Sequence, residues 1–149
     1  MLVFRIAVSK YADRLQASGR AARWNPNEVN IIYTSSSRSL ASLENVVHRS
    51  QLGLNELFKV MTIKIDDQVR INSIKLNDLP ADWKEFHSMP YTQAIGEKWV
   101  NEKTTAILAI PSSVIQEEVN YLLNPAHPDF KHINLINTCP FVFDHRIKI

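Results

Sequence analysis

Short apolar runs, separated by turn-forming residues, make up much of this chain. Runs of this length that are rich in Val, Ile and Phe predict β-strands. Within residues 57–65, Met61, Ile63 and Ile65 point to one side, which is the pattern of a half-buried strand. Strands are predicted at residues 2–7, 29–34, 57–65, 69–74, 104–110, 133–136 and 141–144.

Residues 39–51 have the apolar spacing of a helix instead. The expected N-cap is Ser37 or Ser39. Glu44 lies on the apolar face, where a carboxylate is costly to bury unless a hydrogen-bond donor, a cation or a ligand meets it. The alternative is a helix turned far enough for Glu44 to reach solvent. The apolar face consists of Leu40, Leu43 and Val47.

A second helix is predicted at residues 92–101. Ile95 and Trp99 lie four residues apart on one face of it, and Gly96 is a weak point. Because strands and helices do not alternate regularly, the prediction is an α+β fold rather than a parallel α/β fold. We expect one compact domain over residues 1–149, with small, mostly antiparallel sheets and flanking helices.

Arg23 and Tyr33 are polar side chains at positions that suit a ligand. Arg23 precedes Trp24 and an Asn-Pro turn, so its guanidinium is expected near the base of a loop, where it suits a phosphate or a carboxylate. It could instead stack on Trp24 or pair with a nearby acid. Tyr33 ends a predicted strand with its phenol on the face opposite Ile32, and a strand tyrosine is usually a core residue with its hydroxyl at the rim.

The order of several segments resembles that of the RES-domain family, which is named after an Arg, a Glu and a Ser. The resemblance runs from Val3-Phe4-Arg5-Ile6 to Phe143-Asp144-His145-Arg146 and covers nearly the whole chain. It implies a toxin of a bacterial toxin–antitoxin pair that consumes NAD⁺, a fold similar to that of ADP-ribosyltransferases, and an antitoxin with a helix-turn-helix DNA-binding part. The segments are Ala22-Arg23-Trp24-Asn25, Ile31-Ile32-Tyr33-Thr34-Ser35, Ser39-Leu40-Ala41-Ser42-Leu43-Glu44 and Ile110-Pro111-Ser112.

The resemblance also places the active site. It implies that the site consists of Arg23, Tyr33, Glu44 and Ser112, with Ser113 as a competitor for the last position. Many relatives have a Gly-Gly pair just before the arginine, where this chain has Ala21-Ala22, and alanine does not readily adopt positive φ. The path of this loop is therefore open. Further candidates for substrate binding are Trp24, Asn25 and Asn120.

These residue types suit cleavage of the bond between nicotinamide and ribose in NAD⁺. Departure of nicotinamide builds positive charge on the ribose, which a fixed carboxylate such as Glu44 stabilises. Arg23 would hold the pyrophosphate or an attacking phosphate. Tyr33 could stack on the nicotinamide or bond the ribose, and Ser112 could bond the amide or a phosphate oxygen. Nicotinamide leaves without protonation, so a second carboxylate is not needed.

Three functions are compatible with these residues. The first is a toxin of a bacterial type II toxin–antitoxin system that depletes NAD⁺, with water or inorganic phosphate as acceptor, and that is kept inactive by its antitoxin. The second is an ADP-ribosyltransferase that modifies a macromolecule. The third is a non-catalytic module that binds a nucleotide or a partner. In the first two, NAD⁺ is a substrate and no cofactor is expected; a homo-oligomer is left open.

Length and composition set wider bounds. The chain has 149 residues, of which 45% are hydrophobic, enough for one domain with its own core. The single cysteine, Cys139, excludes an internal disulfide and is expected to pack beside Pro140. The apolar stretch near the N-terminus is short and is broken by Arg5, so we predict no signal peptide, no membrane contact and a cytoplasmic protein.

Charge and motifs exclude other classes. Residues 1–49 have seven basic and three acidic residues, a balance of +4, against −2 for residues 50–149, so the first third could attract a dinucleotide or be an ordinary surface. No basic run or helix-turn-helix predicts direct nucleic-acid binding, and three glycines cannot build a phosphate loop. His127, His132 and Asp129 match no metal-ligand spacing, so no metal is predicted. Asn120, Asn124 and His127 are interpreted mainly as turn residues, although they could line a pocket beside Ser112.

Overall fold

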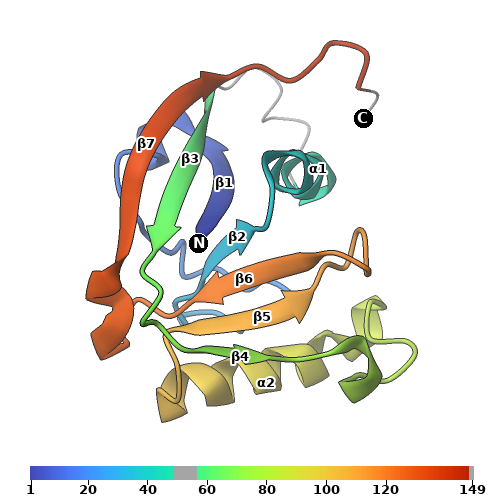
Figure 1. Cartoon of the computed structure of the whole chain (residues 1–149). Helices are drawn as coiled ribbons and strands as arrows, with labels where there is room; N and C mark the ends of the chain where they lie inside the picture. The colour runs from blue at the N-terminus through green and yellow to red at the C-terminus, as the bar shows by residue number, and fades with distance from the viewer. Residues whose placement is uncertain (49–56, 148–149) are drawn as a thin grey trace.

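A computed structural model describes residues 1–48 and 57–147, which form one bent sheet and two α-helices (Figure 1). The strands are β1 (Leu2–Val8), β2 (Ile32–Ser35), β3 (Phe58–Ile65), β4 (Ile71–Ser73), β5 (Ile107–Pro111), β6 (Val119–Leu123) and β7 (Ile133–Phe141). The helices are α1 (Arg38–His48) and α2 (Met89–Glu102). Within the described residues, the strand order is β4-β5-β6-β2-β1-β3-β7, and every neighbouring pair is antiparallel except β4 with β5. The α+β prediction is therefore confirmed, with one sheet in place of several.

The sheet has two halves that diverge between β1 and β2. β1 pairs with β3 from Leu2 to Val8, but its register with β2 is a single pair, Phe4 with Ser35. Figure 1 shows β7, β3 and β1 in one half and β2, β6, β5 and β4 in the other. Beyond Phe4, the backbone of β1 has no strand partner on this side among the described residues, and the Asn45 side chain on α1 donates to the Ile6 carbonyl at 3.2 Å. The gap between the halves is thus bordered by α1.

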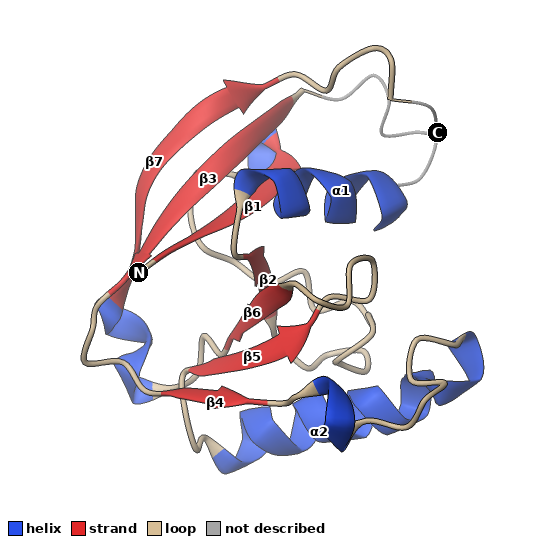
Figure 2. Ribbon diagram, turned by 45° about the vertical axis from the view of Figure 1, so that its right-hand side comes forward, coloured by secondary structure: helices blue, strands red, loops and turns tan. Residues whose placement is uncertain are grey.

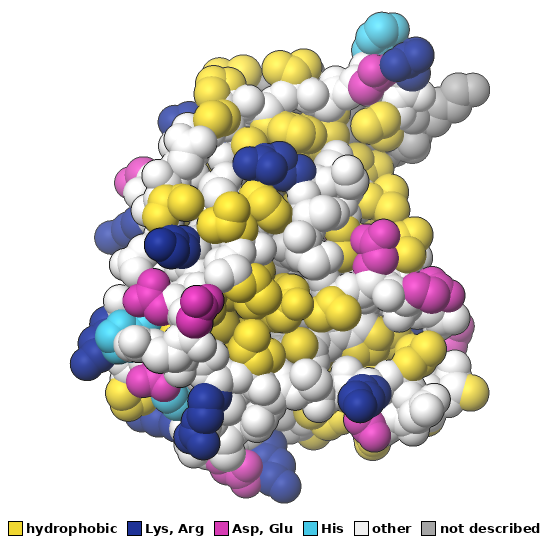
Figure 3. Space-filling model, in the orientation of Figure 1, with side chains coloured by type: hydrophobic (Ala, Val, Ile, Leu, Met, Phe, Trp, Pro, Cys, Tyr) yellow, Lys and Arg dark blue, Asp and Glu magenta, His cyan; other side chains and the backbone are white. Residues whose placement is uncertain are grey.

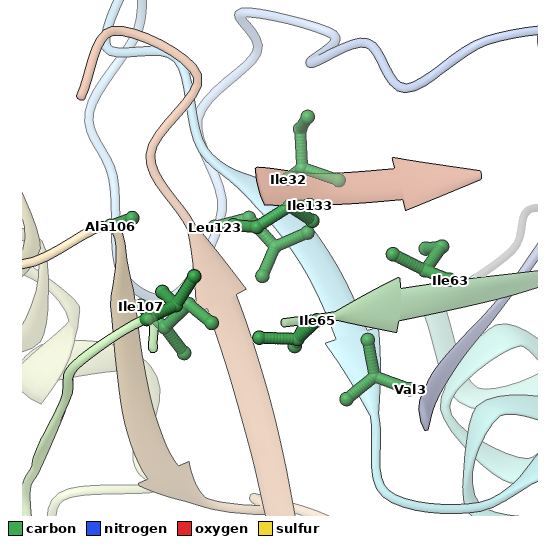
Figure 4. Packing of buried hydrophobic residues seen from close by; sticks show 9 residues of the cluster. Val3, Ile32, Ile63, Ile65, Ala106, Ile107, Leu123 and Ile133 are labelled. Carbon is green, nitrogen blue, oxygen red and sulfur yellow. The ribbon is translucent and has the colours of Figure 1, made fainter. Parts of the chain in front are cut away.

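The core holds the two halves together where they meet. Figure 4 shows apolar side chains from β1, β2, β3, β5, β6 and β7 directed toward one another, among them Val3, Ile32 and Ile63, which are fully buried. A second cluster lies between the β5–β6 half and α2, which Figure 2 shows beside that half. It contains Trp24, Trp83 and Trp99. The two apolar clusters therefore lie on opposite sides of β5 and β6.

The predicted strands differ from the structure in three places. β6 was not predicted, because its polar Asn120 and the Asn-Pro step after it are typical of turns. Residues 29–31 precede β2 and are not in a strand. The strand predicted at 133–136 is longer, because β7 continues through Pro140 to Phe141, and residues 142–144 of the strand predicted at 141–144 are not in a strand. Proline is tolerated there because β7 lies at the edge of the sheet, where one side of the backbone needs no donor.

The helix predictions also need correction. Ser37 is the N-cap of α1, since its hydroxyl accepts from the Leu40 amide at 3.0 Å. The helix is turned so that Leu40 and Ala41 are buried, whereas Leu43 and Val47 are exposed. Residues 49–51 of the predicted helix lie outside the described residues.

Three smaller points concern α2, Cys139 and the membrane. α2 begins three residues earlier than predicted, at Met89, with a proline in its first turn. Cys139 is exposed on the edge strand and is not packed as expected. None of the described helices has the length and apolar content needed to span a bilayer.

Candidate active site

A cavity of about 450 Å³ lies where the two halves of the sheet diverge. It is lined by residues of α1, β1 and β2, the loop before β2, and the ends of β5 and β6. Figure 3 shows hydrophobic side chains gathered in the middle of one face, with charged ones mostly nearer its margin. The cavity is large enough for a nucleotide-sized ligand. Its polar lining includes Arg5, Arg23, Tyr33, Glu44, Asn45, His48, Ser113 and Asn120.

Glu44 points from α1 into this cavity. Three side chains contact its carboxylate: Oε1 accepts from Ser112 Oγ at 2.7 Å and from Asn120 Nδ2 at 2.6 Å, and Oε2 lies 3.0 Å from His48 Nε2. Its side chain is 16% exposed. The alternative in which Glu44 reaches open solvent is therefore wrong, and the donors that a buried carboxylate requires are present.

The charge state of Glu44 follows from two opposing effects. Burial by itself would raise the pKa of the carboxyl group, but hydrogen bonds from His48, Ser112 and Asn120 favour the charged form and leave the pKa below its ordinary value. Glu44 is thus an anion at neutral pH. It is held in one orientation by groups from three separate elements, because Ser112 follows β5, Asn120 lies on β6 and His48 lies on α1.

The two candidate serines have different surroundings. Ser112 is fully buried; its Oγ donates to Glu44 and accepts from the amides of Val114 and Ile115, both at 3.0 Å. Ser113, rather than Ser112, lines the cavity. The geometry therefore gives Ser112 contact with the carboxylate and leaves Ser113 as the hydroxyl beside a ligand.

Arg23 faces the same cavity from the loop before β2. One guanidinium nitrogen donates to the Trp83 carbonyl at 3.1 Å, and the guanidinium lies 5.8 Å from the centroid of the Trp83 ring. Among the described residues, its ring contact is therefore with Trp83 and not with Trp24. Its Nε is buried with no hydrogen-bond partner among the described residues. Burial lowers the pKa of Arg23, while the charges of Glu44 and Glu85 act in the opposite direction, so it remains a cation near Glu44.

The loop that carries Arg23 is fixed by its own side chains. The Tyr33 hydroxyl donates to Asn25 Oδ1 at 2.6 Å and accepts from the Trp24 amide at 3.1 Å. The Asn25 side chain also donates to three carbonyls, those of Arg20, Pro26 and Val29, and Asn25 does not line the cavity. Burial raises the pKa of Tyr33, so its hydroxyl stays neutral. Tyr33 faces the side opposite Ile32, as predicted.

Helix α2 holds the other side of this loop. The Thr92 hydroxyl donates to the Arg23 carbonyl, and Gln93 Nε2 donates to the Ala22 carbonyl at 2.9 Å. A Cβ on Gly96 would lie 1.7 Å from the Trp24 carbonyl oxygen, so only glycine permits this approach. Gly96 was predicted as a weak point of the helix, but it is the contact that lets the loop reach α2.

The alanine pair before Arg23 does not strain the loop. Neither Ala21 nor Ala22 has positive φ; in this loop positive φ occurs at Gly19 and Glu28. The Ala22 amide donates to the Asn25 carbonyl at 2.9 Å, which closes a tight turn around Arg23. A Gly-Gly pair is therefore not needed for this path.

Three lining residues were not found by sequence reasoning. Arg5 on β1 donates to the Gln16 carbonyl at 2.9 Å, and its burial lowers its pKa. Neither Arg5 nor Arg23 forms an ion pair within the described parts of the chain. Asn45 Oδ1 is buried and lacks a partner there. His48 contacts Glu44. The sequence feature that could have identified Asn45 and His48 as lining residues is their place beside Glu44 on α1. Arg5 was interpreted only as a break in an apolar run.

Other predicted residues have structural roles. Trp24 is 2% exposed and lines the cavity with part of its surface. Asn124 is fully buried, and its side chain accepts from the Ala126 amide and donates to the Val100 carbonyl. His127 Nδ1 accepts from the Asp129 amide at the start of a 3₁₀ turn. Of the three residues interpreted as turn formers, only Asn120 lines the cavity.

Comparison with known proteins identifies the family. The RES domain family matches residues 2–144, and the chain therefore belongs to it. A "Prs ADP-ribosylating toxin" of Sphingobium sp. (strain YBL2) is 35% identical over 141 residues, covering 91% of this chain and 88% of the relative. A "Toxin Res" of Yersinia enterocolitica is 31% identical over 153 residues, covering 99% of this chain and all of the relative. These matches confirm the resemblance seen in the sequence.

A solved structure has the same fold. One chain of the crystal structure of the M. tuberculosis MbcT–MbcA toxin–antitoxin complex superposes with a TM-score of 0.73, covering 94% of this chain and 83% of that chain. The sequence identity is 16%, so the likeness concerns the fold. It agrees with the single mostly antiparallel sheet described above.

Proposed function

We propose that this RES-domain chain is the toxin of a bacterial toxin–antitoxin pair and that it consumes NAD⁺ by breaking the bond between nicotinamide and ribose. One observation carries the proposal: a charged glutamate, held by three side chains, faces a nucleotide-sized cavity that also contains two arginines, neither of which has an acid partner among the described residues. Both relatives described above are named as toxins, which agrees with the proposal.

In the proposed reaction, the electron pair of the C1′–N bond leaves with nicotinamide. Positive charge then develops on the ribose, and the Glu44 carboxylate stabilises it. Glu44 needs no proton for this step, which agrees with its lowered pKa. With water as acceptor, the products are nicotinamide, ADP-ribose and a proton. With inorganic phosphate, the ribose carbon bonds to a phosphate oxygen instead.

The remaining lining residues bind and orient the substrate in this proposal. Arg23 and Arg5 are placed on phosphate oxygens, because guanidinium groups suit phosphates and neither is paired with an acid in the described structure. Ser112 positions Glu44, and Asn120 does the same while also facing the ligand. Ser113 is beside the ligand, and Trp24 and Tyr33 supply ring surface to it. Asn25 acts on the ligand only through the loop.

A partner that fills or covers the cavity would keep the toxin inactive. The fold match to a chain of a toxin–antitoxin complex supports an antitoxin of this chain. We propose that the antitoxin carries a helix-turn-helix part for DNA binding.

The test is nicotinamide release from NAD⁺ by the purified chain. We expect release by the wild-type protein and a loss of about a thousandfold in kcat for Glu44→Gln, which keeps shape and removes charge. The products separate the acceptors, since ADP-ribose means water and ADP-ribose 1″-phosphate means phosphate. A folded wild-type protein that releases no nicotinamide, alone or with phosphate, contradicts the proposal.

The second candidate is transfer of ADP-ribose to a protein, which the name of the Sphingobium relative favours. It uses the same cavity and the same Glu44, with a side chain of the target as acceptor. Labelled NAD⁺ and a cell extract distinguish it: label on a protein band that persists in excess phosphate supports transfer, and label only in small products supports NAD⁺ depletion.

A further inference from the structure

His48 lies one turn after Glu44 on α1 and lines the same cavity. Its Nε2 is 3.0 Å from Glu44 Oε2. The imidazole is 57% exposed, whereas the carboxylate side chain is 16% exposed. The ring therefore stands at the solvent side of the acid, between it and bulk water.

The two oxygens of Glu44 are occupied differently. Oε1 accepts from both Ser112 and Asn120, which fills its two lone pairs. Oε2 has His48 as its partner in the described structure and keeps one lone pair for a ligand. Whatever fixes Oε2 therefore fixes the direction of the oxygen that is free to face the ribose.

We propose that His48 is a positioning residue for Glu44, which aims the free lone pair of Oε2 at the ligand by donating from Nε2. The inference rests on the function proposed above, because it assigns His48 a part in that reaction. It requires the neutral ring to carry its proton on Nε2 and none on Nδ1. The same ring, when protonated by acid, forms an ion pair with Glu44 and adds a positive charge next to a ribose that is itself becoming positive.

The charged groups that line the cavity decide whether a protonated His48 speeds or slows cleavage. Arg5 on β1 and Arg23 on the loop are cations, Glu44 is the anion, and Tyr33 on β2 is neutral. The lining residues from β5 and β6 carry no charge. A proton on His48 therefore adds a third positive group against one negative group. Cleavage should therefore slow under acidic conditions that protonate the ring.

Two substitutions separate positioning from mere packing. His48→Leu removes the donor, and we expect kcat for nicotinamide release to fall about tenfold with KM little changed, the size of losing one oriented hydrogen bond to a charged group. His48→Gln keeps an N–H donor that cannot titrate. It should recover most of the kcat and should lack the decline on the acid side that the wild type shows.

The control is Val47→Ala, a neighbouring exposed position on α1 that does not line the cavity. Its kcat and pH profile should match the wild type. Melting temperatures of all variants show whether they fold. Wild-type kcat and an unchanged acid decline in both His48→Leu and His48→Gln would overturn the proposal.

A measurement without catalysis separates this inference from the proposed function. Nitrogen-15 NMR of the histidine rings at neutral pH shows which nitrogen carries the proton, and His48→Gln identifies the signal. We expect the Nε2–H tautomer in the wild type and a mixture in Glu44→Gln. The Nδ1–H tautomer in the wild type would overturn the positioning role, whether or not NAD⁺ is cleaved. No nicotinamide release together with the Nε2–H tautomer would instead contradict the proposed function and keep the geometry.

Discussion

The two functional sides of the cavity are held in different ways. On the acid side, three side chains bond directly to the Glu44 carboxylate. On the cation side, the loop backbone is bonded to Thr92 and Gln93. Within the part of the chain that the structure describes, the Arg23 guanidinium has one hydrogen bond, and its buried Nε has no partner. The acid is thus fixed at its charged atoms, and the cation is fixed at its backbone.

This difference matches what each group has to do. Charge develops at one carbon of the ribose, so the carboxylate gains most from a preset orientation. A guanidinium that follows phosphate oxygens benefits from unused donors and from some freedom at its end. Substitutions on the acid side should therefore lower kcat, and substitutions on the loop side should lower stability and raise KM.

The largest expected effect is on the loop side. Gly96→Ala places a Cβ 1.7 Å from the Trp24 carbonyl oxygen, and because that oxygen belongs to backbone, the loop must move away from α2. We expect the free energy of unfolding to fall by about 3 to 5 kcal/mol, as for other severe overpacking. Urea denaturation followed by tryptophan fluorescence measures it.

Lys98→Ala, at an exposed position on the same helix, is the matched control and should change stability by less than about 0.5 kcal/mol. A Gly96→Ala protein with wild-type stability would show that the loop does not depend on this approach. The comparison between the two sides would then lose its structural basis.

The next effect is on the acid side. Ser112→Ala removes one donor from Glu44 Oε1, and Asn120→Ala removes the other. We expect each to lower kcat for nicotinamide release about thirtyfold with a small change in KM. Because both act on the same oxygen, the double variant should lose less than the product of the single losses. A rise in KM with unchanged kcat would place these residues on substrate binding and not on orientation of the acid.

The sequence was sufficient for the fold class and for most elements of secondary structure. Periodicity located β1, β3, β5 and both helices, because their apolar residues are packed into the buried clusters. It missed β6, in which Asn120 is buried against Glu44 and not exposed in a turn. It also split β7 at Pro140, because the tolerance of an edge strand for proline depends on neighbours that no local pattern contains.

For the candidate site, the sequence likewise indicated the groups but not their contacts. The inward position of Glu44 followed from its place on α1. Of its three partners, His48 lies one turn along the same helix, whereas Ser112 and Asn120 come from segments far away in the chain. The division between Ser112 and Ser113 depends on which side chain the turn after β5 buries. Asn25 was assigned to the substrate, but its bonds are used within the loop. Spacing identifies candidate groups, and tertiary contacts decide what each one touches.

A smaller effect tests whether the Tyr33 hydroxyl stabilises the loop or takes part in catalysis. Tyr33→Phe leaves Asn25 Oδ1 without its donor and the Trp24 amide without its acceptor. We expect a loss of about 1 to 2 kcal/mol in the free energy of unfolding and a rise in KM for NAD⁺. If kcat falls as far as in Glu44→Gln and stability is unchanged, the hydroxyl takes part in the chemistry, and the loop side is then not merely a support.

The smallest expected effect concerns acid stability and tests whether the donors around Glu44 outweigh its burial. The pKa of Glu44 in the folded chain lies below the ordinary value of a glutamate. Its charged form therefore contributes stability that is complete above the ordinary value and is lost as the pH falls through the folded value. The free energy of unfolding of the wild type minus that of Glu44→Gln should thus be constant near neutrality and decline in the acid range. In the Ser112→Ala background the decline should be smaller, since one donor that favours the charge is gone. A difference that grows as the pH falls would mean that burial raises the pKa, in which case the acid side is not held in its charged form.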